Sequence, residues 1–226
     1  MLGLSVSYHR RISRRRNRMS KKEYKDDEEE GGGRLFGVKR SDFNMLLTTY
    51  RHGERDARDE MVMLMHELFK GDEAKVSMID VWYTGVSGLL VCRSNIDPFK
   101  VIRMLRSMVM EEPWRVRYIL RLIPIERVVN TSVEEISDAC SELAAVKIGK
   151  DESFRVTVEK RMMHTLHSMD IIRAVASRID RRVDLVNYDW LVLIEVVGKV
   201  TGVAVLKDDD LFSSIRIKRS LADSSV

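Results

Sequence analysis

The sequence predicts a protein that mixes helices and strands in two successive units, and three observations support this. Apolar residues recur at helical spacing in four segments of the chain. Between these segments lie short runs rich in valine, isoleucine and leucine, which are typical of buried strands. With 226 residues, 44% of them hydrophobic, the chain is long enough to bury more than one core. We therefore expect an α+β or α/β architecture built from two packed units.

The first 40 residues differ in composition from the rest. They hold 12 basic and 6 acidic residues, whereas the remaining 186 residues hold 27 basic and 29 acidic ones. Their basic and acidic runs and their three consecutive glycines lack core-forming periodicity, which predicts a disordered charged tail over 1–40. The arginines of this tail are either phosphate contacts or solvated charges, and Met19 is an alternative first residue. Because the tail accounts for the pI of 9.1, a nucleic-acid surface elsewhere requires local clustering of basic residues.

Residues 41–129 show the element order β-α-β-β-α-β. Apolar runs bounded by turn residues predict strands at 43–50, 75–83, 88–92 and 118–129. One helix is expected to begin at Asp56 and to end at Gly71. The other begins at Asp97 and Pro98, because the aspartate caps free amides and proline at the first helical position loses no hydrogen bond. This order is that of a ferredoxin-like unit.

Residues 130–212 form a second unit of helices and strands. Ser132 and Glu135 have the spacing of a capping box, and a second helix begins at Ser168. The alternation over 154–159 predicts a half-buried strand, and the apolar run 191–197 predicts a strand covered on both faces. A turn from Gly198 leads to a last strand at 203–206. We therefore expect an α/β unit here, followed by a C-terminal tail over 213–226.

Several classes of protein are disfavoured by the composition. No apolar run approaches the ~20 residues of a membrane-spanning helix, and the few apolar residues before the first arginines are too short a run for a secretory signal. Two cysteines, Cys92 and Cys140, form no disulfide framework, and with five scattered histidines they form no zinc site. We expect a cytoplasmic protein with no membrane association and no metal.

Four separated segments resemble the THUMP domain, an RNA-binding module of tRNA-modifying enzymes. Two carry the core of the resemblance, namely the basic-ended strand Phe154 to Arg161 (FRVTVEKR) and the stretch Val183 to Val197 (VDLVNYDWLVLIEVV). Two more, Ala204 to Lys207 (AVLK) and Arg121 to Ile125 (RLIPI), resemble the stand-alone branch that partners the tRNA cytidine N4-acetyltransferase. The resemblance extends over residues 43–212 and leaves out the first 40 residues.

The resemblance implies a function as well as a fold. It implies a ferredoxin-like unit and a THUMP unit that together bind tRNA, while a separate acetyltransferase makes N4-acetylcytidine. The expected partners are therefore tRNA and that enzyme. Lys160 and Arg161 are the basic residues that best match the basic strand end of the family.

Charge and expected facing add further candidates for RNA contact. Arg115, Arg117, Arg121 and Arg127 all lie at odd-numbered positions and are therefore an even number of residues apart, so in one strand they would share a face. The full set of expected RNA-binding residues is Arg117, Arg121, Lys160, Arg161, Arg173, Arg178, Arg181 and Arg182. If the fold brings these positions together, they form a phosphate-binding surface. The alternative for each is an ordinary surface salt bridge.

Other polar and aromatic residues have two interpretations each. Asp184, Asn187 and Asp189 form either a metal or general-base site or, as we prefer, a turn stabilised by their own side chains. Glu195, inside an apolar strand, either pairs with an arginine, which we prefer, or points outward. His164 lies three residues before His167 without a nearby third ligand. Four aromatic residues either stack on bases or pack in a core: Trp114, Tyr118, Tyr188 and Trp190. For Trp190 we prefer packing in a core.

The sequence contains no motif of a known catalytic machinery. It lacks a phosphate-binding P-loop, a glycine-rich turn for S-adenosylmethionine or a dinucleotide, and a nucleophile elbow. It also lacks the cysteine pair of zinc deaminases. We therefore expect a non-catalytic adaptor with no cofactor and no catalytic residues. Two alternatives stay open: a scaffold that binds only protein, which the net charge of −2 beyond residue 40 favours, and an RNA-modifying enzyme.

Overall fold

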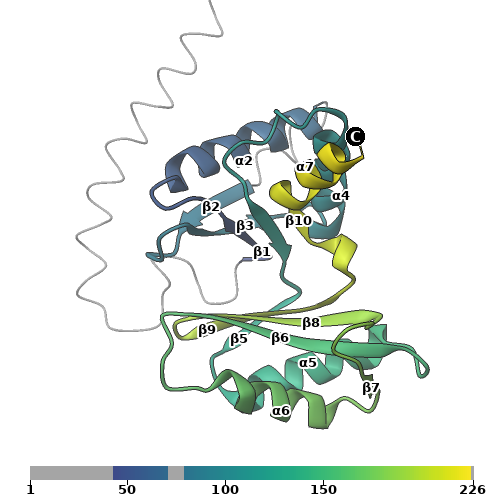
Figure 1. Cartoon of the computed structure of the whole chain (residues 1–226). Coiled ribbons are helices and arrows are strands. Elements are labelled where there is room, and N and C mark those ends of the chain that lie inside the picture. Colours follow the sequence, from purple (N-terminus) through teal and green to yellow (C-terminus); the bar gives the residue numbers. More distant parts are fainter. Residues whose placement is uncertain (1–42, 71–78, 225–226) are drawn as a thin grey trace, which may run out of the picture.

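The computed structural model describes residues 43–70 and 79–224. These residues form two five-stranded sheets and five α-helices, arranged as four layers in the order helix, sheet, sheet, helix (Figure 1). The protein is therefore a mixed α+β protein, as its sequence predicts. The tail expected over residues 1–40 lies outside the described residues.

The first sheet contains the strands of the expected β-α-β-β-α-β segment. Its strands follow the spatial order β10 (Phe212–Ser213), β4 (Arg121–Pro124), β1 (Met45–Thr48), β3 (Leu89–Ser94) and β2 (Ile79–Tyr83). All neighbouring strands are antiparallel. Helices α2 (Glu54–Leu68) and α4 (Pro98–Glu111) connect the strands on the outer face.

The two helices of this sheet form for reasons visible in the sequence. The Asp97 side chain accepts a hydrogen bond from the Phe99 amide, and Pro98 is the first residue of α4. The apolar stripe of α4 packs against the sheet, as does that of α2. Helix α2 begins at Glu54, two residues before the expected Asp56, and Gly53 precedes it without a side-chain cap.

The second sheet contains most of the remaining chain. Its strands follow the order β5 (Arg127–Asn130), β9 (Val200–Leu206), β8 (Trp190–Val197), β6 (Ser153–Arg161) and β7 (Arg182–Val183). Strand β6 is parallel to both of its neighbours, and the other pairs are antiparallel. Helices α5 (Val133–Lys147) and α6 (Ser168–Arg178) cover the outer face, and the Ser132 hydroxyl caps α5 at the Glu135 amide.

The single strand expected over 118–129 is in fact two strands in different sheets. The chain leaves the first sheet after Pro124, where the Ile125 amide donates to the Asn44 carbonyl. One residue later the Glu126 amide donates to the Val203 carbonyl, so the chain has joined the second sheet. Periodicity did not reveal this transfer because both strands are extended and apolar.

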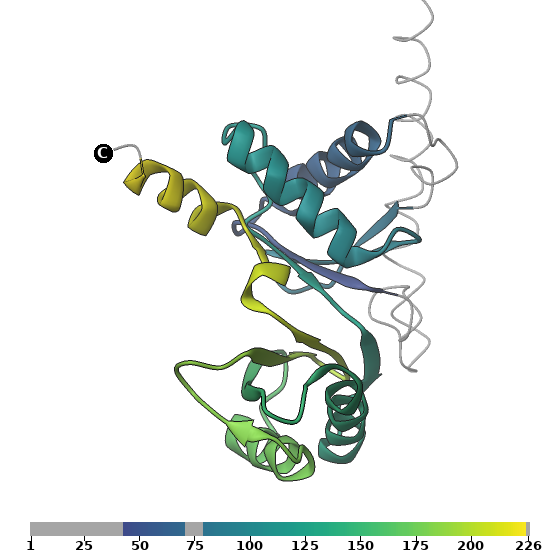
Figure 2. The ribbon, with the colours of Figure 1, turned by 90° about the vertical axis from the view of Figure 1, so that its right-hand side faces the viewer.

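The residues expected to form a C-terminal tail, 213–226, instead include a helix. Strand β10 adds to the edge of the first sheet, and the Ser213 hydroxyl then caps α7 (Ser214–Asp223) at the Arg216 amide. Ile217 and Leu221 pack against the first core, one helical turn apart. Figure 2 shows α7 projecting from the side of the molecule next to α4, at the level of the first sheet.

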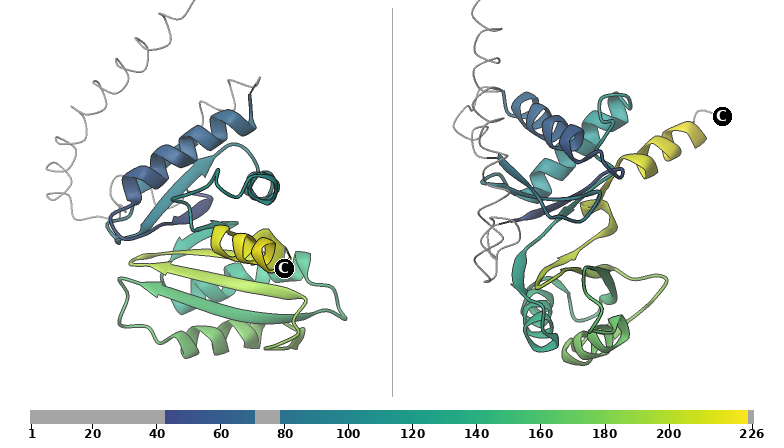
Figure 3. Two further views of the ribbon diagram at one scale, coloured as in Figure 1. Left: turned by 45° about the horizontal axis from the view of Figure 1, so that its top comes forward. Right: turned by 90° about the vertical axis from the view of Figure 1, so that its left-hand side faces the viewer.

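The inner faces of the two sheets enclose an apolar layer of their own. Leu46, Val91 and Ile123 of the first sheet contact Leu193 and Ala204 of the second, and all five side chains are buried. This layer is separate from the two cores that lie beneath the helices. The sheets therefore pack directly on each other, and Figure 3 shows them stacked between the outer helices.

Candidate nucleic-acid interface

Strand β6 carries a polar face toward the first sheet. Phe154, Val156 and Val158 pack beneath α5 and α6, so the alternate residues point the other way. These alternate residues are Arg155, Thr157, Glu159 and Arg161. Strand β6 lies next to β7, the short strand at the edge of the second sheet. Its polar face therefore borders the apolar layer between the sheets and does not lie at the centre of that layer.

A buried carboxylate joins this face to the first sheet. Glu195, on the neighbouring strand β8, is 0% exposed and forms an ion pair with Arg161 through Oε2. Its other oxygen, Oε1, accepts no hydrogen bond from the described residues. The preferred interpretation of Glu195 as the partner of an arginine is confirmed.

Arg121 approaches the same carboxylate from the first sheet. It begins β4, paired with Thr48 and Ser213. Burial raises the pKa of Glu195, and the charges of Arg161 and Arg121 oppose this shift. The charges of two expected residues, one from each sheet, therefore act on one buried carboxylate.

The charges of two further arginines act on Tyr188, and one of the two contacts its ring. The Arg155 guanidinium lies 5.8 Å from the centre of the Tyr188 ring, within the range of a cation–π contact. The Tyr188 hydroxyl donates to Asp208 at 2.9 Å. Arg216, in the first turn of α7, is close enough for its charge to lower the pKa of Tyr188, although burial and Asp208 raise it on balance. Arg155 belongs to the second sheet, whereas Arg216 follows the last strand of the first.

We name the surface made of Arg121, Arg155, Arg161 and Arg216 the junction face. Arg155 and Arg161 contact Tyr188 and Glu195 directly, and the charges of Arg216 and Arg121 act on the same two side chains. Its carboxylates are Glu159, the buried Glu195, and Asp208, which is bonded to Tyr188. Guanidinium groups suit phosphate because they offer several donors in a planar fork. The arrangement can bind a backbone that carries several phosphates and crosses from one sheet to the other.

The other expected residues lie apart from the junction face or are engaged elsewhere. The Lys160 ammonium, on the opposite face of β6, donates to the Leu166 carbonyl and braces the loop before α6. Arg178 forms an ion pair with Asp138 of α5, and Arg181 donates to the Ile148 carbonyl at 3.0 Å. Arg117 and Arg173 are exposed in the loop before β4 and on α6. Arg182 is exposed on edge strand β7, where it pairs with Ser153, two residues before Arg155. The eight expected residues thus do not form a single patch.

The even separation of the four arginines Arg115, Arg117, Arg121 and Arg127 does not place them on one strand face. Arg115 and Arg117 precede β4 in a loop, and Arg127 lies in the other sheet. Arg115 forms ion pairs with Glu67 and Glu112, and Arg127 forms one with Glu142. For these two residues the surface salt bridge is the correct interpretation.

Sequence reasoning missed Arg155 and Arg216 as members of the surface. The signal for Arg155 is its even spacing from Arg161, which places both on one face of a strand. The signal for Arg216 is the helical spacing of Ile217 and Leu221 after a capping serine. This pattern contains only two apolar residues, which are too few to predict a helix at the charged end of the chain.

The acidic and aromatic candidates stabilise the turn before β8. Asp184 accepts the amides of Val186 and Asn187, at 2.9 and 2.8 Å, and these bonds lower its pKa. Asp189 binds the amide and hydroxyl of Ser153, which lowers its pKa for the same reason. The preferred interpretation of these residues as a turn is therefore correct.

The outcomes for the remaining candidates differ in kind. Trp190 is half-buried against the second core, and its indole donates to Glu152 at 2.7 Å.

Within residues 43–70 and 79–224, no three His, Cys, Asp or Glu side chains are placed to hold a metal ion. The helices in the same ranges are all too short or too polar to cross a bilayer.

A solved structure shares the fold. The crystal structure of PH1313 from Pyrococcus horikoshii aligns with 73% of this chain and 54% of its own chain, with a TM-score of 0.53 and 21% sequence identity. Because the identity is low, this likeness concerns the fold alone.

A match to a protein family covers the second sheet and its helices. Residues 130–206 match the THUMP domain family, so the chain contains a THUMP domain. The Saccharomyces cerevisiae protein named tRNA acetyltransferase TAN1 is 31% identical over 112 residues, which is 42% of this chain and 37% of that protein. The uncharacterized protein C25H2.10c of Schizosaccharomyces pombe is 26% identical over 122 residues, 51% of this chain and 42% of the relative. The matched part thus spans less than half the length of either relative.

Proposed function

We propose that this chain is a tRNA-binding adaptor that presents tRNA to a separate cytidine N4-acetyltransferase. The acetyltransferase forms N4-acetylcytidine, and this chain contributes binding and orientation but no catalytic group. Its partners are then tRNA and that enzyme, and its proposed place of action is the cytoplasm.

The observation that carries the proposal is the convergence of four arginines from both sheets on the junction face. The folded part of the chain is not basic overall, with 27 basic and 29 acidic residues beyond residue 40. A local cluster is therefore needed to attract a polyanion, and the junction face supplies one. Phosphate contacts of this kind position a nucleic acid without reading its sequence.

The comparisons support tRNA as the nucleic acid. The chain contains a THUMP domain, and one relative has a name that joins tRNA to acetyl transfer. We extend the link with tRNA acetylation to this chain, and we assign the chemistry to another protein. The reason is that no loop of the sequence has the glycine pattern that would hold the pyrophosphate of acetyl-coenzyme A.

The test is an acetylation assay with purified components. The full chain, tRNA and acetyl-coenzyme A are incubated with and without a separately purified tRNA cytidine acetyltransferase, and N4-acetylcytidine is quantified by mass spectrometry. We expect no product from the chain alone and more product from the two proteins together than from the enzyme alone.

A matched pair of variants shows whether the junction face is responsible. Arg121→Gln, Arg155→Gln and Arg216→Gln together remove three arginines of the junction face. A control removes three arginines that form surface ion pairs elsewhere, Arg58, Arg127 and Arg178. Stimulation of the acetyltransferase should be lost only in the first variant. Product from the chain alone, or equal stimulation by both variants, contradicts the proposal.

A further inference from the structure

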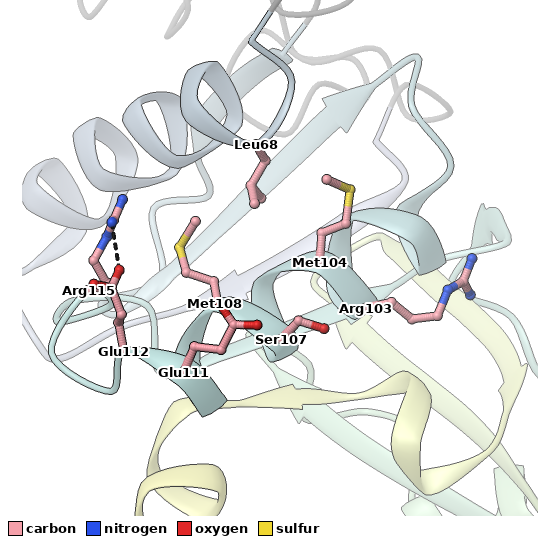
Figure 4. A pocket seen from close by; sticks show the side chains of 8 residues that line it. All are labelled: Leu68, Arg103, Met104, Ser107, Met108, Glu111, Glu112 and Arg115. Carbon is pink, nitrogen blue, oxygen red and sulfur yellow. Dashed lines mark hydrogen bonds and ion pairs between the residues drawn. The ribbon is translucent and has the colours of Figure 1, made fainter.

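An apolar groove lies between α2 and α4 on the outer face of the first sheet. It consists of two adjoining hollows of about 450 and 430 Å³, which share Leu68 and Met104 as lining residues. Met108 extends the floor toward the carboxyl end of α4. Figure 4 shows Leu68 of α2 opposite the two methionines of α4. All three side chains are only partly buried by the core beneath them.

The charges around this groove are unequal at its two ends. Lys70, Lys100 and Arg103 lie at the end near the start of α4, and Asp97 is the acidic residue among them. Glu67, Glu111 and Glu112 lie at the other end, where Arg115 bridges the first and third of these. Figure 4 shows this separation, with Arg103 at one end and Arg115 and Glu112 at the other. The groove is therefore apolar in the middle, basic at one end and acidic at the other.

We propose that this groove binds an amphipathic helix of a partner protein, with an acidic end at Lys100 and Arg103 and a basic end at Glu111. A groove between two helices accepts a helix whose apolar residues recur every three or four positions. Methionine suits such a floor because its flexible side chain adapts to the partner. The charge pattern of the groove matches the common pattern of helices, which carry acidic residues in their first turn and basic residues in their last.

The groove is separate from the junction face. Helices α2 and α4 cover the outer face of the first sheet, whereas the junction face lies at its inner side, toward the second sheet (Figure 1). The chain can therefore hold a protein and a nucleic acid at the same time. The inference does not depend on tRNA binding, so either proposal can fail while the other stands.

The probe is a set of synthetic peptides of about 14 residues, the length of α4. One peptide combines an apolar stripe of leucine with glutamates in its first turn and lysines in its last turn. A second has serine in place of the stripe, and a third keeps the stripe but has lysines at both ends. Binding to the full chain is followed by the NMR signals of the methionine methyl groups and by fluorescence anisotropy.

The first peptide is expected to shift the Met104 and Met108 signals and to bind at least about tenfold more tightly than the serine peptide, because its leucine side chains leave water when they enter the groove. The double variant Lys100→Glu with Arg103→Glu changes two exposed side chains. It should bind the first peptide more weakly and the peptide with lysines at both ends more tightly. Met63→Gln, a change at a side chain 70% exposed and outside the groove lining, should leave the affinities unchanged.

Two results would overturn the proposal. One is equal binding of the leucine and serine peptides, or an unchanged ranking in the charge-reversed variant. The other is a dimer, detected by sedimentation, that dissociates on Met104→Gln with Met108→Gln, because the occupant of the groove would then be a second copy of this chain.

Discussion

Glu195 and Arg161 form an ion pair whose two members differ in burial. Glu195 is 0% exposed, whereas the Arg161 side chain keeps 22% of its surface. Burying a carboxylate is unfavourable unless a partner compensates, and here one oxygen has no hydrogen bond. The pair therefore ties the end of β6 to β8, and removing its basic member leaves the buried carboxylate with only the charge of Arg121 to offset its burial.

This asymmetry predicts different effects of two isosteric changes on stability. Arg161→Gln should lower the free energy of unfolding at neutral pH by about 3–5 kcal/mol, because Glu195 stays buried without its ion-pair partner. Glu195→Gln should not lower it, and the double variant should recover most of the loss. Urea unfolding of the three variants measures these differences. Equal losses in both single variants would contradict the role assigned to the pair.

The pH dependence has a definite sign. The pKa of Glu195 is raised above 4.5 by burial, so between 4.5 and its folded-state pKa the folded protein binds this proton more tightly than the unfolded chain. Stability from this group is therefore present at low pH and declines as the pH rises through the folded-state pKa. In Arg161→Gln the decline should be steeper and should extend to higher pH. Glu195→Gln lacks the decline, which makes it the control in unfolding curves measured across this range.

At the scale of elements, the contact of β9 with the link between β4 and β5 sets the spacing of the two sheets. A β-carbon on Gly202 would lie 2.9 Å from Cδ1 of the buried Ile125 and 3.1 Å from its Cγ2. Gly202 pairs with Glu195 on β8, so the same contact supports the buried ion pair. Larger side chains at this position would push the sheets apart.

Gly202→Val should therefore lower the free energy of unfolding by about 1–3 kcal/mol, as overpacked cores do. Combining it with Ile125→Ala should restore part of the loss, because the space freed by the isoleucine accepts the added methyl groups. Thermal unfolding of the two single variants and the double variant measures this coupling. If the two losses simply add, the proposed close contact between the sheets is wrong.

The elements predicted from the sequence divide by whether local signals specify them. Asp97 with Pro98 and Ser132 with Glu135 mark helix starts by side-chain chemistry, and both helices begin there. The transfer of the chain from one sheet to the other at Ile125 has no local signal, because an extended apolar segment looks the same in either sheet. Helix α7 was missed because its stability comes from packing on α4, which spacing alone does not reveal.

At the scale of the whole molecule, the surface for a polyanion depends on stacking of the two sheets. The first sheet and the helix after its last strand contribute Arg121 and Arg216, and the second sheet contributes Arg155 and Arg161. Neither sheet alone therefore carries the junction face. Sequence reasoning identified Arg121 and Arg161 from charge and strand ends. It could not separate them from Arg178 or Arg127, because whether an arginine faces a carboxylate depends on neighbours distant in the chain.

The central claim is most directly tested by the salt dependence of tRNA binding. Dissociation constants of the full chain are measured over a range of salt concentrations for the natural protein and two variants. The first variant is Arg121→Gln, Arg155→Gln and Arg216→Gln together, and the control is Arg58→Gln, Arg127→Gln and Arg178→Gln together. Both lose three positive charges and both keep the Arg161–Glu195 pair.

Each lost phosphate contact lowers the slope of log affinity against log salt by about 0.7–0.9. The junction variant should therefore bind more weakly with a slope smaller by about 2–3, whereas the control should keep nearly the natural slope. The opposite result, in which the control loses as much slope as the junction variant or the junction variant keeps its slope, would contradict tRNA binding at the junction face.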